Sequence, residues 1–198
     1  MSAGHALGAV RHPHPPLADG VIVLRALEAR DAPALARAAA DPDIARFAYS
    51  EWFPAGDESA ALAFVVDQLP ALAERGRAVM LGIFPREGGG LLGATALTNL
   101  DSEGGCGELG CWIVADARGR GLGERASRMT CRWGFSALGL HRIQALTDPA
   151  NARAERGLRA MGFVPEGILR GIDRRPDGHH DRRCWSLLAS DHAALAAL

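Results

Sequence analysis

The sequence contains no lysine, so all 22 of its basic side chains are arginines. With 23 acidic residues, the formal net charge is −1. This balance argues against a protein that coats nucleic acid through a basic surface, and we expect no direct nucleic-acid partner. Guanidinium groups suit bidentate contacts with phosphate, but a compositional bias of the source genome explains the absence of lysine equally well.

Long apolar runs and paired cysteines are also missing. No apolar run approaches the roughly 18 residues that span a bilayer, and the N-terminus lacks the charged and apolar segments of a secretory signal. Cys106, Cys111, Cys131 and Cys184 form no Cys-x-x-Cys pair, so neither a zinc ribbon nor a thioredoxin-like motif is supported. We therefore expect free thiols, a cytoplasmic protein, no membrane contact and no bound metal.

The length and the apolar content fit one globular domain. The chain has 198 residues, of which 48% are hydrophobic, enough to bury a sizeable core. Residues 1–19 are rich in glycine, histidine and proline and are expected to form a flexible leader. Residues 20–198 then form a single domain.

Hydrophobic periodicity predicts a mixture of strands and helices. The expected strands are residues 21–24, 78–84, 91–97, 107–114, 143–147, 163–169 and 183–188. The expected helices are residues 32–40, a short helix after Pro42, residues 57–75 with an interruption at Pro70, a long amphipathic helix over 122–137, and residues 151–161. This pattern predicts an α/β (α+β) fold, with helices covering a central sheet.

The segment 108–123 gives the clearest indication of a ligand-binding site in the sequence. A strand runs into Arg118-Gly119-Arg120-Gly121-Leu122-Gly123, and a helix begins at once. Glycines let the backbone approach a ligand closely. The first amides of a helix have no internal partner and favour an anion. The segment therefore suggests a phosphate or pyrophosphate site, although a glycine-rich connector with solvated arginines would look the same.

Two familiar nucleotide motifs do not match this segment. A Walker A loop ends in Gly-Lys-Ser/Thr, and the chain has no lysine. A Rossmann fingerprint requires Gly-x-Gly-x-x-Gly, but Glu124 occupies the position of the last glycine. The loop must therefore be judged together with its surroundings.

In these surroundings the chain resembles the Gcn5-related N-acetyltransferase (GNAT) superfamily. Arg118-x-x-Gly121-x-Gly123 is similar to the family's Arg/Gln-x-x-Gly-x-Gly/Ala loop. Three further segments resemble the Rim-type branch, the ribosomal-protein N-acetyltransferases and their relatives. They are residues 108–113 (Glu-Leu-Gly-Cys-Trp-Ile), 140–143 (Leu-His-Arg-Ile) and 163–170 (Phe-Val-Pro-Glu-Gly-Ile-Leu-Arg). The resemblance covers residues 20 to 190.

The resemblance implies a mixed, mostly antiparallel sheet with helices on both faces, and acetyl-CoA held where two parallel strands splay apart. Those strands correspond to residues 106–114 and 143–147. Backbone groups of Ile113 and Val114 would hold the pantetheine and thioester. The pyrophosphate would bind the loop residues Arg118, Gly119, Arg120, Gly121, Leu122 and Gly123. Asn151 would touch the pantetheine arm, and Arg156 could reach a CoA phosphate or remain a solvated arginine.

The implied reaction is direct attack of a primary amine on the thioester, with Glu108 as the candidate general base. An ordinary strand-edge carboxylate explains Glu108 equally well. The general acid is unassigned, because Ala154 stands where Rim-type enzymes often have serine and the only tyrosine is Tyr49. A non-catalytic acyl-CoA-binding module and a transferase for another acyl group, such as succinyl, are therefore open alternatives.

The acceptor is an amine that the sequence does not name. It could be a protein N-terminus or a small molecule. Tyr49 and Trp52, within an aromatic stretch, could line its site, although a role in the core is favoured. The aromatic and hairpin segments could also support a homodimer.

Overall fold

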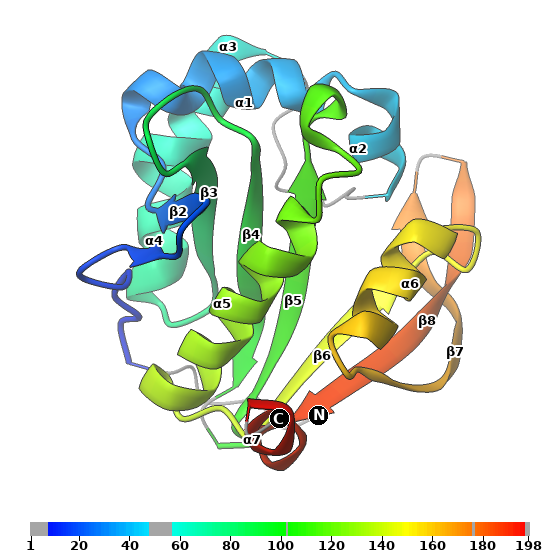
Figure 1. The fold of residues 1–198 in the computed structure, drawn as a ribbon. Helices are drawn as coiled ribbons and strands as arrows, with labels where there is room; N and C mark the ends of the chain where they lie inside the picture. The colour runs from blue at the N-terminus through cyan, green and yellow to red at the C-terminus, as the bar shows by residue number, and fades with distance from the viewer. Residues whose placement is uncertain (1–7, 48–56, 102, 176, 197–198) are drawn as a thin grey trace.

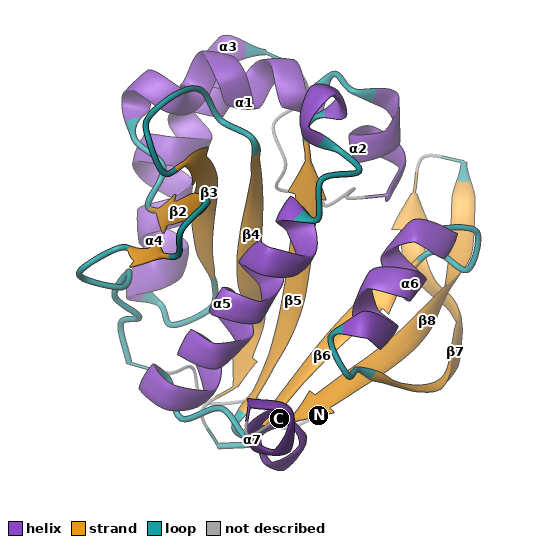
Figure 2. Ribbon diagram, viewed as in Figure 1, coloured by secondary structure: helices purple, strands orange, loops and turns teal. Residues whose placement is uncertain are grey.

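A single twisted sheet organises the chain. The computed structural model describes residues 8–47, 57–101, 103–175 and 177–196, and within them eight strands pair in the order β1-β2-β3-β4-β5-β6-β8-β7 (Figures 1 and 2). Every neighbouring pair is antiparallel except β5 and β6, which are parallel. The strands are β1 Leu17–Ala18, β2 Ile22–Arg25, β3 Val79–Pro85, β4 Gly93–Asp101, β5 Cys106–Ile113, β6 Arg142–Thr147, β7 Val164–Arg175 and β8 Gly178–Leu188.

Helices connect the strands and cover the sheet. They are α1 Ala32–Ala39, α2 Pro42–Phe47, α3 Glu58–Ala63, α4 Leu69–Glu74, α5 Leu122–Ala137, α6 Ala152–Ala160 and α7 Ala189–Ala196. None of these helices, in the segments that the structure describes, is long and apolar enough to cross a bilayer. The mixed, mostly antiparallel fold predicted from the sequence is confirmed.

Pro70, where the sequence suggested an interruption of the helical segment, directly follows a change of helix type within one helical run. A π-helical turn over Phe64–Gln68 joins α3 to α4, and the Leu69 amide donates to the Phe64 carbonyl. Proline has no N–H, so it fits the first turn of α4, where that donor would have no partner in the helix. In the π turn the amide donates to the carbonyl five residues earlier instead of four, and the helical run continues through Pro70.

Two hydrophobic clusters lie on opposite faces of the sheet. One contains Leu122, Ala126 and Trp133 of α5 together with Leu109 of β5. The other contains residues of α1, α3 and α4 together with Trp112 of β5. Because successive side chains of a strand point to opposite faces, β5 contributes to both clusters, and its position is fixed from both sides.

The last two strands are longer than predicted. The sequence suggested residues 163–169 and 183–188, whereas β7 continues to Arg175 and β8 begins at Gly178. The additional stretch is rich in charge, and its charges are paired: Asp173 contacts Arg175 at 2.7 Å and Arg182 at 2.7 Å. Because charged residues occupy these positions, the stretch lacks the alternation of apolar and polar residues by which a strand is recognised in a sequence.

Part of the expected leader contacts the domain. The Val10 side chain is buried, and its amide donates to the Ala73 carbonyl at 2.8 Å. Asp19 pairs with Arg125 of α5 at 2.7 Å. Val10 and Asp19 therefore connect this segment to the domain.

Arg142 of β6 and Glu166 of β7 join two strands that lie on either side of β8. Their two nitrogen–oxygen pairs are 2.7 and 2.5 Å apart. The hydrogen bonds from Arg142 and Ser186 lower the pKa of Glu166 from 4.5 to about 2. A carboxylate with a lowered pKa stabilises the folded state above its unfolded pKa and loses that effect as the pH falls through its folded pKa.

We therefore expect Glu166→Gln to have a lower Tm than the wild type at pH 7. The difference should shrink as the pH falls from about 4.5 to about 2, because over this range the Glu166 carboxylate of the unfolded chain takes up a proton while that of the folded protein stays charged. Thermal unfolding at a series of pH values measures this. The control is Glu87→Gln, since Glu87 is exposed in the β3–β4 loop. A Tm difference for Glu166→Gln that stays constant with pH would contradict the expectation.

Candidate functional site

The parallel pairing of β5 and β6 ends soon after it begins. The paired residues are Cys106 with Arg142, Gly107 with Ile143, and Glu108 with Gln144. Beyond Glu108 the two strands diverge, as Figure 1 shows, and we call this divergence the fork. The β5 edge is open there: Gly110 and Cys111 are exposed, and a Cβ on Gly110 would meet no atom within 4 Å.

Backbone groups of β5 face into the fork. Antiparallel neighbours exchange hydrogen bonds at every second residue. Val114 N–H donates to the Leu92 carbonyl at 2.9 Å, and in this register Trp112 and Gly110 also point their backbone groups toward β4. Cys111 and Ile113 therefore point theirs toward the fork, where the register gives them no partner on β6.

This arrangement changes the expected contribution of Val114. Its amide is bonded to Leu92, and its carbonyl accepts from the Ala117 amide at 3.0 Å. Neither group is free for a ligand. The backbone of Cys111, which the sequence did not single out, faces the fork beside the Ile113 amide, because alternation along β5 sets which residues face the fork.

The loop after β5 offers a row of free amides. Gly119 (φ +78°) and Gly121 (φ +71°) adopt the left-handed conformation that favours glycine. In the described part of the chain, no backbone oxygen accepts from the amides of residues 119–124, and the first helical bond runs from the Arg125 amide to the Gly121 carbonyl. The dipole of the 16-residue helix α5 adds positive potential at this end.

This end of α5 lies against the fork. A Cβ built on Gly123 would be 3.4 Å from Ile113 Cγ1 and 3.7 Å from Cys111 Sγ. Leu122, whose amide is free, has its side chain buried in the cluster under α5. The free amides and the open β5 edge thus form one continuous surface of hydrogen-bonding backbone groups.

The two arginines of the loop differ. The Arg118 amide donates to the Ala115 carbonyl, and its guanidinium contacts Asp41 at 2.8 Å and Asp43 at 3.0 Å, so its charge is already paired. Arg120 is exposed and makes no ion pair with another described residue. Within the loop, Arg120 is therefore the side chain that can meet an anion without first giving up a carboxylate.

Glu108 stands at the base of the fork, in the last parallel pair. Its Oε2 accepts from Gln144 Nε2 at 3.1 Å and from Asn99 Nδ2 at 3.3 Å. Asn99 adopts a positive φ of +48°, beside a register shift in the β4–β5 ladder. Glu108 has the strand parity of Trp112, opposite to Leu109, and so lies on the sheet face away from α5.

The two amides beside Glu108 were not found from the sequence. Asn99 and Gln144 come from strands on either side of β5, and only the register brings them together. Neither residue belongs to a motif. A sequence signal for them would require knowing the strand pairing in advance.

Of the four remaining predicted residues, Asn151 and Arg156 belong to α6 and its N-terminal cap. Asn151 caps α6, its Oδ1 accepting from the Ala154 amide at 3.1 Å, so its Nδ2 is the group left for a ligand. Arg156 is exposed on α6 and makes no ion pair in the described segments. Tyr49 and Trp52 lie outside the described residues.

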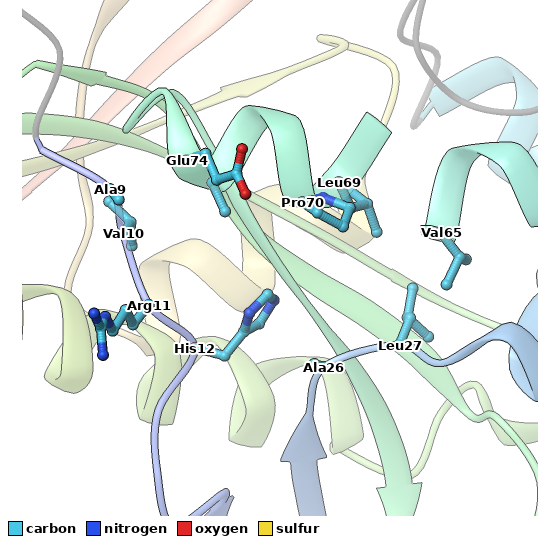
Figure 3. A pocket seen from close by; sticks show the side chains of 11 residues that line it. Ala9, Val10, Arg11, His12, Ala26, Leu27, Val65, Leu69, Pro70 and Glu74 are labelled. Atoms are coloured by element: carbon cyan, nitrogen blue, oxygen red, sulfur yellow. The ribbon is translucent and has the colours of Figure 1, made fainter. Parts of the chain in front are cut away.

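A hollow of about 530 Å³ occurs elsewhere, between the N-terminal segment and α4 (Figure 3). Its wall is mainly apolar and includes Val10, Leu27 and Leu69, with the polar groups of His12 and Glu74 at its margin. Burial lowers the pKa of His12, against the effect of its hydrogen bond with the Met80 backbone. None of the predicted site residues that the structure describes lines this hollow, and it lies away from the fork.

Three comparisons relate the chain to known proteins. Residues 22–164 match the family model described as an acetyltransferase (GNAT) domain. The uncharacterized N-acetyltransferase p20 of Bacillus licheniformis is 27% identical over 172 residues, covering 87% of this chain and 95% of that protein. This similarity extends over nearly the whole of both sequences.

Two solved structures share the fold. Mycobacterium smegmatis RimJ in complex with CoA-disulfide aligns with a TM-score of 0.79 and 23% identity, covering 94% of this chain and 97% of that one. Spermidine N-acetyltransferase from Vibrio cholerae, in complex with CoA and spermine, aligns with a TM-score of 0.74 and 19% identity, covering 88% and 99%. The fold, the family model and the relative agree with the resemblance noted in the sequence, and the chain belongs to the GNAT family of N-acetyltransferases.

Proposed function

We propose that this protein transfers an acetyl group from acetyl-CoA to a primary amine. The observation that carries the proposal is the continuous surface of unpaired backbone donors formed by residues 119–124 and the fork edge of β5. A helix N-terminus with free amides suits a diphosphate, and an unpaired strand edge suits the amides of a pantetheine arm. The CoA complexes of structures with the same fold support this reading.

The loop residues would hold the coenzyme's diphosphate mainly through the backbone. The amides of Gly119, Gly121 and Gly123 belong to the free row, and a Cβ on Gly119 or Gly121 would meet nothing within 4 Å, so there is open space beside the backbone. Arg120 adds a guanidinium suited to phosphate oxygens. Arg156 on α6 is a further candidate for a CoA phosphate, because it is exposed and unpaired among the described residues.

The β5 edge would hold the arm and the thioester. Cys111 offers a free amide and carbonyl, and Ile113 offers an amide, while the Ile113 carbonyl already accepts from Arg118 Nε at 3.0 Å. Asn151 Nδ2 would contact the arm from the opposite side of the fork. A backbone amide of this edge would also stabilise negative charge on the carbonyl oxygen during transfer.

Glu108 would remove the proton from the amine, directly or through a water molecule. Both amide donors bind its Oε2. They hold the carboxylate in one orientation. Its other oxygen receives no hydrogen bond from the described residues, which leaves it free to accept a proton from the amine side.

A thiol intermediate does not fit this site. Although Cys111 as a residue is exposed, its thiol lies against the start of α5, 3.8 Å from the Gly123 carbonyl, and desolvation of the sulfur raises the pKa of the thiol to about 11, against the effect of a hydrogen bond with Ser127. Burial also raises the pKa of Cys131 to about 12. At neutral pH both groups are protonated and weakly nucleophilic, which supports direct attack of the amine on the thioester.

One observation favours a second candidate, an acyl-CoA-binding protein without turnover. Ala154 lies on the first turn of α6, where Rim-type relatives often have serine, and it offers no proton to the leaving thiolate. In the transferase, water would supply that proton. Release of free CoA thiol in the presence of amines separates the two candidates.

We expect CoA to stabilise the wild type against heat. At about 100 times its Kd, a ligand adds about 2.7 kcal/mol to the free energy of unfolding, or about 5–10 °C in Tm for a domain of this size. Gly121→Glu should abolish the shift, because its carboxylate would occupy the diphosphate position. Differential scanning fluorimetry with and without CoA measures both.

Gly139→Glu is the matched control. Gly139 ends α5, has a φ of +67°, and has open space around its Cβ position, as Gly121 does. Both variants therefore suffer the same backbone strain, but only Gly121→Glu should lose the response to CoA. Equal responses in the two variants would contradict a diphosphate site at the start of α5.

Glu108→Gln should lower kcat by about 10²- to 10⁴-fold, the usual contribution of a general base, and leave the CoA affinity unchanged. Thiol release with a panel of N-terminal peptides and polyamines gives the rates, and calorimetry gives the CoA affinity. An unaffected kcat would remove Glu108 from this role.

A further inference from the structure

The Arg118 side chain ties three parts of the fold together. Its Nε donates to the Ile113 carbonyl at 3.0 Å, its Nη2 lies 2.8 Å from Asp41 Oδ2, and its Nη1 lies 3.0 Å from Asp43 Oδ2. Only 19% of the side chain is exposed. One guanidinium thus connects the end of β5, the glycine loop and the start of α2.

Asp41 directly precedes α2 and binds both Arg118 and the first turn of that helix. Its Oδ1 accepts from the amides of Asp43 at 2.9 Å and Ile44 at 3.2 Å, while its Oδ2 binds Arg118. Burial works against it, but hydrogen bonds from Arg118 and from these amides keep the pKa of Asp41 below its ordinary value. The carboxylate therefore stays charged at neutral pH and holds both α2 and the arginine.

We infer that Arg118 is a positioning residue that links the coenzyme loop to α2, so that the two move as one unit when CoA binds. The inference rests on the proposed function, since it assumes that CoA binds this loop. Figure 1 shows α2 beside the carboxyl end of β5, next to the fork. Of the described α2 side chains, only Ile44 is buried, and the ion pairs with Arg118 attach the start of the helix to the loop.

A direct phosphate contact is a poor alternative for Arg118. The guanidinium already faces two carboxylates at hydrogen-bond distance, and an approaching phosphate would have to displace them or share the group with like charges. Arg120, two residues away, is exposed and without an ion pair in the described segments. The loop therefore separates two tasks, with Arg120 facing the anion and Arg118 facing α2.

The link has a thermodynamic consequence. If CoA fixes the loop, the ion pairs should transmit that order to α2, and loss of the ion pairs should uncouple them. Amide hydrogen exchange in peptides covering residues 42–47 reports this without any knowledge of the amine. In the wild type we expect saturating CoA to slow exchange there by about fivefold, the lower end of typical coupling.

Three variants test the assignment. Arg118→Ala should bind CoA with a Kd within about threefold of the wild type but show no slowing of exchange in residues 42–47. Asp43→Asn, which removes one partner from an exposed position, should reduce the slowing even if Arg118→Ala folds poorly. Arg120→Ala is the matched control: its Kd should rise about tenfold, the loss of one charge-assisted hydrogen bond, with the slowing retained at saturation.

The outcomes are distinct. Arg118→Ala with a Kd raised tenfold or more and normal slowing would make Arg118 a phosphate ligand and overturn the inference. CoA binding to the wild type without slowing in residues 42–47 would also overturn it, while leaving the proposed function intact. Absence of CoA binding to the wild type would remove the proposed function and the link together.

Discussion

The site depends on the early end of the hydrogen bonding between β5 and β6. Each strand can leave the other because each keeps a full antiparallel partner on its far side. β4 pairs with β5 as far as Ile113, and β8 pairs with β6 from Arg142 to Thr147. The sheet therefore stays intact while one strand edge is left with unsatisfied backbone groups, a condition that folded proteins otherwise avoid.

Arginine side chains connect the strands and helices around the fork. Arg142 joins β6 to β7 through Glu166, and Arg128 of α5 binds both Glu124 and the Ala160 carbonyl at the end of α6. Arg183 of β8 contacts Glu155 of α6 at 2.7 Å. Planar guanidiniums suit such multiple contacts better than ammonium groups do, so a chain without lysine is well equipped for them.

The features that could be predicted from the sequence are those formed by residues close together in the chain. The loop from Arg118 to Gly123 and the long helix after it are visible in consecutive residues, because turn chemistry and helical periodicity act over short distances. The contacts of Glu108 with Asn99 and Gln144 depend on strand register, and the ion pairs of Arg118 with Asp41 and Asp43 join segments far apart in the chain. The hydrogen bond from the Val114 amide to the Leu92 carbonyl was hidden for the same reason, since it belongs to a ladder that only the fold defines.

The placement of Glu108 on the sheet face away from α5 bears on the order of events. If the coenzyme enters along the α5 face and the amine approaches from the other, neither has to leave before the other arrives. Such a geometry suits a ternary complex, in which both substrates are present when the acyl group moves, and it is unsuited to a double-displacement scheme. The two products would then depart by separate exits, one on each side of the sheet.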